Sequence, residues 1–256
     1  MDHVILLCDL ATPDPEAVKR ALRQVRRFTE ADAVRMAREP GGLIARNLSS
    51  EEASLVRRAL EADGVAAVGL PSAQLPKLPQ SRLLKRMEFQ PQSWVVYDPL
   101  GRATPVPWVQ VAALCAGAVR HFGLSSAVSQ EWVRDHTGLA GVGGYRLETE
   151  VRHSVEDNTL FRLEILLAGG GMRFEVEAEN FLFGPSLSRP GVGPAEKLAV
   201  LIAQFKAHAP HLRLNRGAEA LLANPKAPTV YSSRQALADD SVWLLWRLAS
   251  NPGGAA

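Results

Sequence analysis

The side chains best suited to metal chemistry are two histidines in the last third of the chain. His208 and His211 are three residues apart, a spacing that could supply two imidazole ligands to a zinc ion. Pro210 lies between them and breaks a helix at this point, and neither a carboxylate nor a cysteine accompanies the pair. We therefore expect no metal site here.

His153 is the histidine with the strongest case for proton transfer, because carboxylates lie near it in the sequence. These carboxylates are Glu150, Glu156 and Asp157. Such a group could act as a general acid or base, but we favour the alternative that His153 ends a strand beside an acidic turn. The nearby glycines at 141–144 precede a strand, whereas glycine loops that hold phosphates follow a strand and open a helix. With no nucleophile-elbow or P-loop motif, we expect no catalytic residue and no cofactor.

Aromatic residues are concentrated in the stretch WVVYDPLGRATPVPW, residues 94–108. Its two apolar runs flank a Pro-Leu-Gly turn signal, which predicts a β-hairpin. Alternation along the first strand places Trp94 and Tyr97 on opposite faces, so these rings and Trp108 cannot share one surface. We expect the aromatic rings to stabilise the core rather than to line a ligand site.

A run of basic residues follows one side of the first predicted helix, which extends from Pro15 to Phe28. Its apolar residues fall on the opposite side, so the helix is amphipathic with a basic outer face. The candidate partner-binding residues are Lys19, Arg20, Arg23, Arg26 and Arg27. They could dock an acidic protein or RNA, or they could simply be a solvated helix face. The lack of aromatic residues on this face argues against sequence-specific RNA recognition.

Residues 1–72 read as a small α/β sandwich in the order strand, helix, helix, strand, helix, strand. Asp14 before Pro15 favours a helix start, and capping signals at Thr29 and Ser49 favour two more. Gly64 ends the third helix before a last strand. This order predicts a three-stranded sheet with three helices.

The run VKRALRQVRRFTEADAVRMAREPGGLIARNLSSEEASLVRRALEADGVAAVGL resembles the C-terminal domain of the bacterial ribosomal stalk protein, a fold shared with the Clp protease adaptor. The likeness covers about the first quarter of the chain. It rests on the Gly/Pro turn, the strand before Ser49, and the Leu-Glu-Ala-Asp-Gly end of the last helix. The resemblance implies this fold, and a first helix that contacts protein factors through basic residues. Arg23 and Arg26 match that basic run.

Residues 73–80 contain two prolines and no regular periodicity, which predicts a semi-rigid linker to a second module, residues 81–256. Residues 81–87 favour one basic helical turn. The segment 108–119 is ambiguous, and we prefer a short turn followed by a strand. Residues 129–136 favour a helix that starts from a serine cap.

Three alternating runs, YRLETEVRH, LFRLEILL and MRFEVEAEN, predict an antiparallel meander with turns at 154–158 and 168–171. One face would be dry and the other charged and wet. A helix beginning at 193–196 and a C-terminal helix over 233–248 follow. The second module is therefore expected to be an antiparallel β-rich, pleckstrin-homology-like rolled sheet with C-terminal helices, and the chain an α+β protein.

The composition excludes few classes of protein. The 256 residues are 46% hydrophobic and 22% charged with a net charge of +2, which is ordinary for globular proteins. Cys8 and Cys115 are far apart and read as buried small side chains in a reducing compartment. No segment approaches the roughly 20 apolar residues of a membrane span. We expect a cytoplasmic protein.

These patterns favour a non-catalytic protein-interaction or adaptor protein whose partner has an acidic surface. The main alternative is a small-ligand binder or enzyme with a pocket in the C-terminal β module, near His153 and the 123–144 loop. A third hypothesis is binding of RNA or an anionic membrane surface through the basic helix and residues 82–86. The sequence does not specify an oligomeric state.

Overall fold

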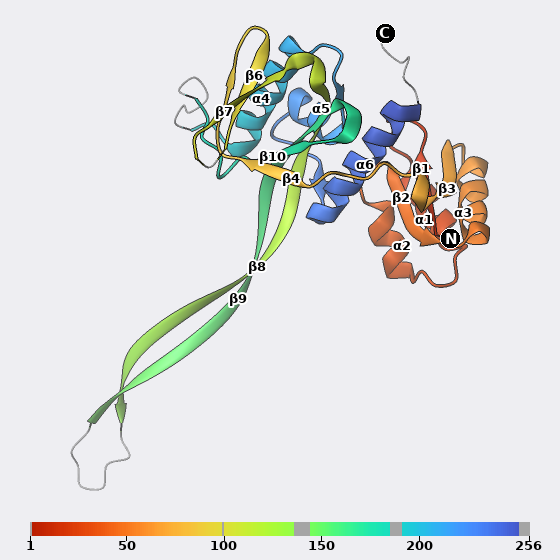
Figure 1. The fold of residues 1–256 in the computed structure, drawn as a ribbon. Helices are drawn as coiled ribbons and strands as arrows, with labels where there is room; N and C mark the ends of the chain where they lie inside the picture. Colours follow the sequence, from red (N-terminus) through yellow and green to blue (C-terminus); the bar gives the residue numbers. More distant parts are fainter. Residues whose placement is uncertain (1, 99, 136–143, 185–190, 251–256) are drawn as a thin grey trace. The chain divides into compact units, whose positions relative to one another are not determined.

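The computed structural model describes residues 2–98, 100–135, 144–184 and 191–250, with side chains except at 122–157 and 170 (Figure 1). The chain forms two compact units. The first comprises Met1–Val119 and Leu160–Ala256, and the second comprises Arg120–Thr159, where the described residues are β-strand. The mixture of helices and sheets confirms the α+β class.

The N-terminal sheet has the order β2-β1-β3, with both pairs antiparallel. Its elements are β1 (His3–Leu7), α1 (Pro15–Leu22), α2 (Glu30–Ala37), β2 (Leu43–Leu48), α3 (Ser50–Ala62) and β3 (Ala67–Pro71). The predicted order of strands and helices is confirmed. Asp14, Thr29 and Ser49 are the N-caps, and the last two form capping boxes with the acidic residue three positions later.

The first helix is shorter than expected, because α1 ends at Leu22 instead of continuing to Phe28. After Leu22 the backbone N–H groups of Gln24 and Val25 bond to carbonyls three residues earlier, in tight turns rather than in α-helical geometry. Val25 is buried in this tightened segment. The predicted last helical turns are therefore absent, and the Val25 side chain packs in the core from a non-helical segment.

The remaining strands form two further sheets. One has the order β11-β8-β9-β10-β4, with β12 also paired to β8, and the other has the order β5-β6-β7. The strands are β4 (Ser81–Leu84), β5 (Met87–Phe89), β6 (Ser93–Tyr97), β7 (Ala103–Pro107), β8 (Val111–Asp135), β9 (Gly144–Leu167), β10 (Arg173–Glu177), β11 (Arg213–Leu214) and β12 (Val230–Tyr231). Because β4 is parallel to β10, and β11 and β12 are parallel to β8, the larger sheet is mixed rather than antiparallel.

Several local predictions for this part are confirmed and three are wrong. The hairpin in 94–108, the turn before β8 (Trp108–Gln110) and the turn at 168–171 are all present. The predicted basic helical turn at 81–87 is instead strand β4, which pairs with β10. The predicted helix at 129–136 is strand up to Asp135, and no turn interrupts β9 at 154–158. In each case strand pairing overrides local propensity.

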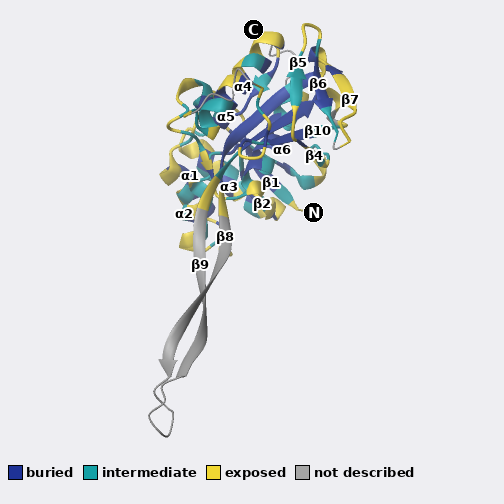
Figure 2. Ribbon diagram, turned by 90° about the vertical axis from the view of Figure 1, so that its left-hand side faces the viewer, coloured by how far each residue is buried: buried dark blue, intermediate teal, exposed yellow. Residues whose placement is uncertain are grey.

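Three helices complete the fold: α4 (Pro194–His208), α5 (Arg216–Ala223) and α6 (Arg234–Ser250). The charged face of β9 and β10 was expected to be wet, and this is wrong, because Glu164 and Glu175 are 2% and 1% exposed. Ser241 of α6 donates a 2.6 Å hydrogen bond to Glu164, and Arg234 of α6 pairs with Glu175. Helix α6 therefore covers these charges. Buried segments, dark blue in Figure 2, are concentrated in the strands.

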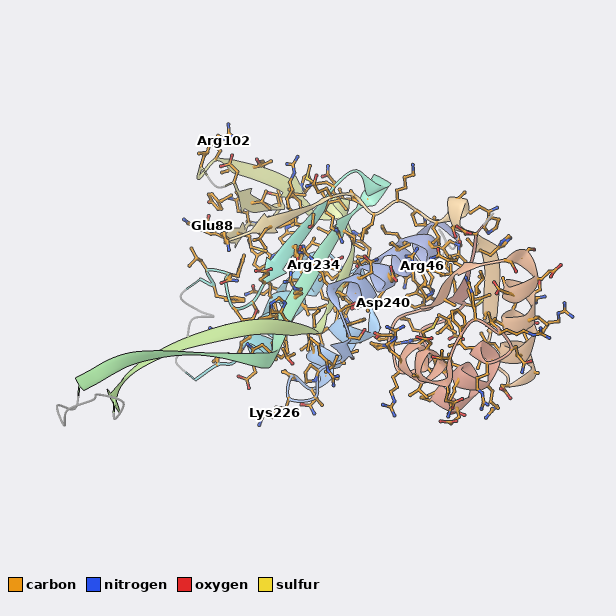
Figure 3. All side chains as sticks on the ribbon, turned by 90° about the horizontal axis from the view of Figure 1, so that it is seen from below. Arg46, Glu88, Arg102, Lys226, Arg234 and Asp240 are labelled. Carbon is orange, nitrogen blue, oxygen red and sulfur yellow. The ribbon has the colours of Figure 1, made fainter. Side chains whose placement is uncertain are left out.

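Helix α6 also contacts the N-terminal sheet, so residues 1–72 and α6 share a hydrophobic cluster. The Trp243 indole donates a 2.7 Å hydrogen bond to the Leu7 carbonyl, and Arg46 pairs with Asp239 at 2.7 Å. Figure 3 labels Arg46 and Asp240 beside this helix. The predicted boundary between 1–72 and 81–256 stays a prediction, although both ranges contribute to the first compact unit. Among the described residues, no helix has the length and apolarity needed to cross a membrane.

Candidate ligand-binding site

A cavity of about 700 Å³ lies between strands of the two C-terminal sheets. The buried part of its lining belongs to one hydrophobic cluster and consists of Leu84, Val96, Val106, Leu167 and Phe174. Phe174 packs edge-on against Trp94 at 5.2 Å between ring centroids, and Trp94 packs likewise on Phe205 at 5.3 Å. This aromatic packing fixes the apolar floor of the cavity.

A tight turn between β6 and β7 forms one part of the rim. The Asp98 carboxylate accepts hydrogen bonds from the backbone N–H groups of Leu100 (2.9 Å) and Arg102 (2.8 Å) and from the Arg102 guanidinium (2.6 Å). The Arg102 backbone N–H and guanidinium lower the pKa of Asp98, so this carboxylate stays ionised near neutral pH. Gly101 has φ of 77°, which suits the turn. Asp98 and Arg102 therefore neutralise each other at the rim.

Tyr97 lies on the same rim and is held by two side chains. Its hydroxyl hydrogen-bonds to Glu88, which raises the pKa of Tyr97, and the Arg86 guanidinium lies 4.7 Å from the ring centroid. Arg86 also pairs with Glu88. Figure 3 labels Glu88 and Arg102 in this part of the molecule. The phenol therefore stays protonated and fixed in position, and its charged neighbours compensate each other.

Arg82 differs from the other charged residues of the rim, because it forms no ion pair with a described residue. It is exposed on β4, in register with Phe174 of the neighbouring β10. Since residues in register on adjacent strands lie on the same face of a sheet, Arg82 lies on the face that carries the apolar floor. One uncompensated positive charge therefore lies at the edge of an apolar cavity.

The described lining of the cavity offers an apolar floor and a polar rim to a ligand. It has no histidine, cysteine or lysine, and its single carboxylate is committed to the turn. The remaining lining residues at or near the rim are Leu83, Thr104, Pro105, Gln110 and Met172. Volumes of roughly 300–1,000 Å³ with apolar walls and a few polar groups are usual for sites that bind small molecules.

Most of the charge of the five basic residues predicted to bind a partner is compensated, and only Lys19 and Arg20 of the five lie in α1. Four form ion pairs within the N-terminal module, and Arg26 is exposed with no ion pair to a described residue. The pairs are Lys19 with Glu16 and Glu30, Arg20 with Asp63, Arg23 with Glu30, and Arg27 with Glu52. Such exposed pairs contribute little stability, yet they weaken the field that an acidic partner would meet.

His208, one of the two histidines considered as metal ligands, packs against an aromatic ring. His208 stacks on Trp108 with 4.6 Å between ring centroids, and its Nδ1 contacts the Gln204 carbonyl at 2.9 Å. Over the described ranges no cluster of three histidine, cysteine or acidic residues could hold a metal ion. The predicted position of a pocket, near His153 and the 123–144 loop, lies outside the described side chains.

The three aromatic residues behave as alternation predicted. Trp94 and Trp108 are buried in the cluster around Phe205, whereas Tyr97 lies on the opposite side of its strand, at the rim of the cavity. The positions of Tyr97 and Arg82 at the rim of the cavity were not predicted from the sequence. Arg82 was assigned to a helical turn, and only its pairing in β4 places it beside Phe174.

The comparisons with known proteins give no independent indication of function. No family model, curated protein or solved structure matches this chain.

Proposed function

We propose that the protein is a non-catalytic binding protein whose C-terminal β module holds a small amphipathic anion. The apolar body of the ligand would fill the cavity of about 700 Å³, and its acidic group would pair with Arg82. The observation that carries this proposal is the uncompensated Arg82 on the same sheet face as Phe174. An arginine fork can bind a carboxylate through two parallel hydrogen bonds, which favours an acidic over a neutral ligand.

The ligand class can be tested with a matched pair of probes, dodecanoate and dodecanol, which share an alkyl chain and differ in charge. Isothermal titration calorimetry should show tighter binding of dodecanoate to the full chain. In Arg82→Gln, dodecanoate binding should weaken about tenfold, which corresponds to about 1.4 kcal/mol, while dodecanol binding should hardly change. Lys226→Gln removes an exposed charge that is not part of the cavity lining and serves as the control.

A second variant tests the cavity itself. Thr104 is exposed and lines the cavity, so Thr104→Trp should obstruct it without disturbing the buried floor. Both probes should then bind at least about tenfold more weakly. Equal binding of the two probes to the wild type, or unchanged binding to Thr104→Trp, would contradict the proposal.

The adaptor function remains a separate prediction for the N-terminal module. It is supported by the order of strands and helices in residues 1–72, which is the one that the stalk-domain resemblance implies. The ion pairs of four of these residues reduce its electrostatic basis. The pleckstrin-homology-like description of 81–256 and the cytoplasmic location likewise remain predictions.

A further inference from the structure

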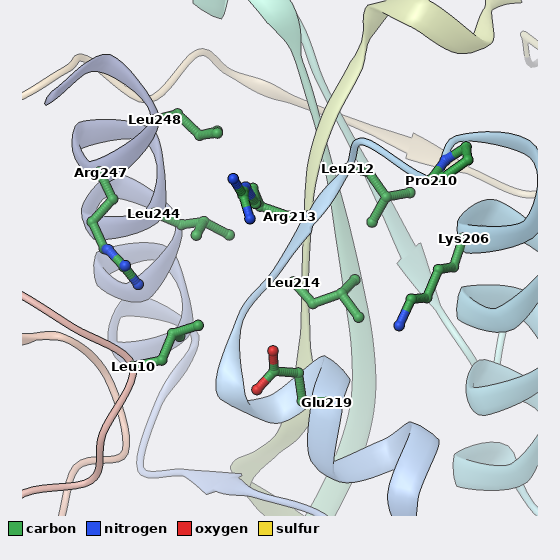
Figure 4. Close-up of a pocket in the computed structure, with 10 residues that line it drawn as sticks. All are labelled: Leu10, Lys206, Pro210, Leu212, Arg213, Leu214, Glu219, Leu244, Arg247 and Leu248. Carbon is green, nitrogen blue, oxygen red and sulfur yellow. The ribbon is translucent and has the colours of Figure 1, made fainter. Parts of the chain in front are cut away.

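A cavity of about 350 Å³ elsewhere in the first compact unit has basic side chains in its lining but does not gather them around one point (Figure 4). Its lining comes from the segment after β1, the end of α4, β11 with α5, and the last turns of α6. In Figure 4 the charged ends of Lys206, Arg213 and Arg247 point to different sides. Their charges therefore do not converge on one ligand.

The ligand-binding cavity, by contrast, has two leucines beside its rim whose side chains are largely exposed. Leu100 is 78% exposed in the turn between β6 and β7, and its backbone N–H donates a 2.9 Å hydrogen bond to the Asp98 carboxylate. Leu182 is 67% exposed, and its backbone N–H donates a 2.8 Å hydrogen bond to the Lys85 carbonyl. Leucines gathered at one rim differ from single exposed leucines, which are common on protein surfaces.

A shallow hollow of about 420 Å³ connects the positions of these leucines. Its lining residues are Lys85, Arg86, Tyr97, Asp98 and Gly101. Leu100 precedes Gly101 in the chain and Leu182 is bonded to Lys85, so each leucine adjoins a residue of this lining. The hollow shares Tyr97 and Asp98 with the ligand-binding cavity, so the two lie next to each other.

The charged residues around the cavity and the hollow are predominantly basic. The cations are Arg82, Lys85, Arg86 and Arg102, and the carboxylates are Glu88 and Asp98. Arg86 and Arg102 each pair with one of these carboxylates, whereas Arg82 and Lys85 form no ion pair with a described residue. Glu177, whose carboxylate the Lys85 charge also reaches, pairs with Arg162 at 2.8 Å. Two positive charges of the rim therefore remain uncompensated.

Exposed apolar side chains beside uncompensated cations suit a surface that lies on an anionic lipid bilayer. Apolar side chains enter the boundary between headgroups and acyl chains, and tyrosine rings such as Tyr97 are common at headgroup level. Lysine and arginine are attracted by the negative surface potential of anionic lipids. An acidic protein would match the cations but would not require the exposed leucines, so a bilayer matches more of the rim.

We propose that this rim, defined by Arg82, Lys85, Tyr97, Leu100 and Leu182, docks on an anionic lipid bilayer. The proposal rests on the proposed function in one respect, because docking would bring the cavity to the phase in which an amphipathic anion dissolves. It retains residues 82–86 from the sequence-based hypothesis of an anionic membrane surface and leaves out the basic helix. Two leucines and two uncompensated cations give weak, reversible binding, as a single acyl chain does.

Vesicle flotation with the full chain tests the docking without any ligand in the cavity. Vesicles of phosphatidylcholine are compared with vesicles in which part of the phosphatidylcholine is replaced by phosphatidylglycerol. The partition coefficient should be at least about tenfold higher on the anionic vesicles, because two uncompensated cations meet their surface potential. Most of this preference should disappear as the ionic strength rises.

Single substitutions assign the docking to this rim. Lys85→Gln should lower the partition coefficient on anionic vesicles about fivefold. Leu100→Ser and Leu182→Ser should each lower it at least about threefold on both kinds of vesicle, because they remove apolar contact. The matched controls are Leu55→Ser, at a leucine of α3 that is 45% exposed, and Lys226→Gln, and both should partition like the wild type.

Calorimetry with dodecanoate separates this proposal from the proposed function. Leu100 and Leu182 are not in the cavity lining, so both serine variants should bind dodecanoate as the wild type does. Dodecanoate binding without vesicle binding would overturn the docking proposal and leave the proposed function standing. Vesicle binding without dodecanoate binding would support the docking and contradict the proposed function.

Three further results would overturn the docking proposal. The first is equal partitioning on the two kinds of vesicle, and the second is wild-type partitioning of both Lys85→Gln and Leu100→Ser. The third is binding to soluble polyglutamate that requires Lys85, with no binding to vesicles, which would identify an acidic protein as the partner instead.

Discussion

At the scale of single residues, Asp240 is a buried acid that contacts several segments of the chain. Its carboxylate is buried and accepts hydrogen bonds from the Tyr231 hydroxyl (2.7 Å), the Asn215 amide (2.9 Å) and the Gly42 backbone N–H (3.0 Å). Burial raises the pKa of Asp240, and these hydrogen bonds act in the opposite direction. Each partner comes from a different segment, so this carboxylate connects α6 to the N-terminal sheet and to β12.

The pH dependence of stability should reveal this role in Tyr231→Phe. The raised pKa in the folded state means that folding becomes less favourable as the pH rises from the unfolded value of about 4 through the folded value. Loss of the hydroxyl raises the folded pKa of Asp240 further. The variant should therefore lose about 1–3 kcal/mol of unfolding free energy near neutral pH and less under acid conditions. Urea unfolding at several pH values measures this, and a loss that is equal at every pH would refute it.

At the scale of elements, the contact between α6 and the start of β2 depends on a glycine. A Cβ atom at Gly42 would lie 2.0 Å from the Trp243 ring, closer than any real contact. The absence of a side chain at Gly42 lets Trp243 reach the Leu7 carbonyl. Glycine is therefore required at position 42 because the Trp243 ring packs directly against the backbone there, and not because the backbone has a positive φ.

Gly42→Ala should displace Trp243 and lower the unfolding free energy by about 1–3 kcal/mol or more. The matched control is Gly171→Ala, because a Cβ atom at Gly171 meets no atom within 4 Å and φ there is −81°. The control should keep or slightly exceed wild-type stability, by up to about 1 kcal/mol. Thermal unfolding of the two variants compares them directly, and equal melting temperatures would show that α6 tolerates the extra methyl group.

At the scale of the whole molecule, one hydrophobic cluster joins parts that the sequence assigns to two modules. It contains β1, β2 and α3 side chains together with Cys115 of β8, Leu166 of β9 and Trp243 of α6. Arg216 adds hydrogen bonds to three carbonyls of the N-terminal segment, those of Leu10, Ala11 and Pro40. Because the hydrophobic cluster is buried, unfolding of residues 1–72 should expose the apolar side chains of β8, β9 and α6 that belong to it.

Residues 1–119 and 160–256 should therefore unfold in a single cooperative transition. Amide hydrogen exchange can test this, since the slowest amides of β1 and β10 should report the same opening free energy. If the amides of β1 exchanged through a separate, lower-energy opening while those of β10 stayed protected, residues 1–72 would be an independent domain, as the linker pattern predicts.

The local features of the fold were within reach of sequence reasoning. Side-chain caps at Asp14, Thr29 and Ser49 act within a few residues, so their presence in the sequence predicts the helix starts directly. The same is true of the β6–β7 hairpin, whose turn is closed by Asp98 and Gly101. Alternation correctly placed Trp94 and Tyr97 on opposite faces, because a strand has a period of two residues.

The sequence by itself determined the helix starts, the hairpin turn and the apolar faces, since these depend on interactions between near neighbours. Only the tertiary structure decided that α6 covers Glu164 and Glu175, that β4 pairs with β10 to bring Arg82 beside Phe174, and that Arg213 and Arg247 line one cavity. Strand pairing and helix docking join residues that are distant in the sequence, such as Ser241 and Glu164, which are 77 positions apart. The free energy of such contacts depends on which surfaces meet, and local sequence patterns do not encode that choice.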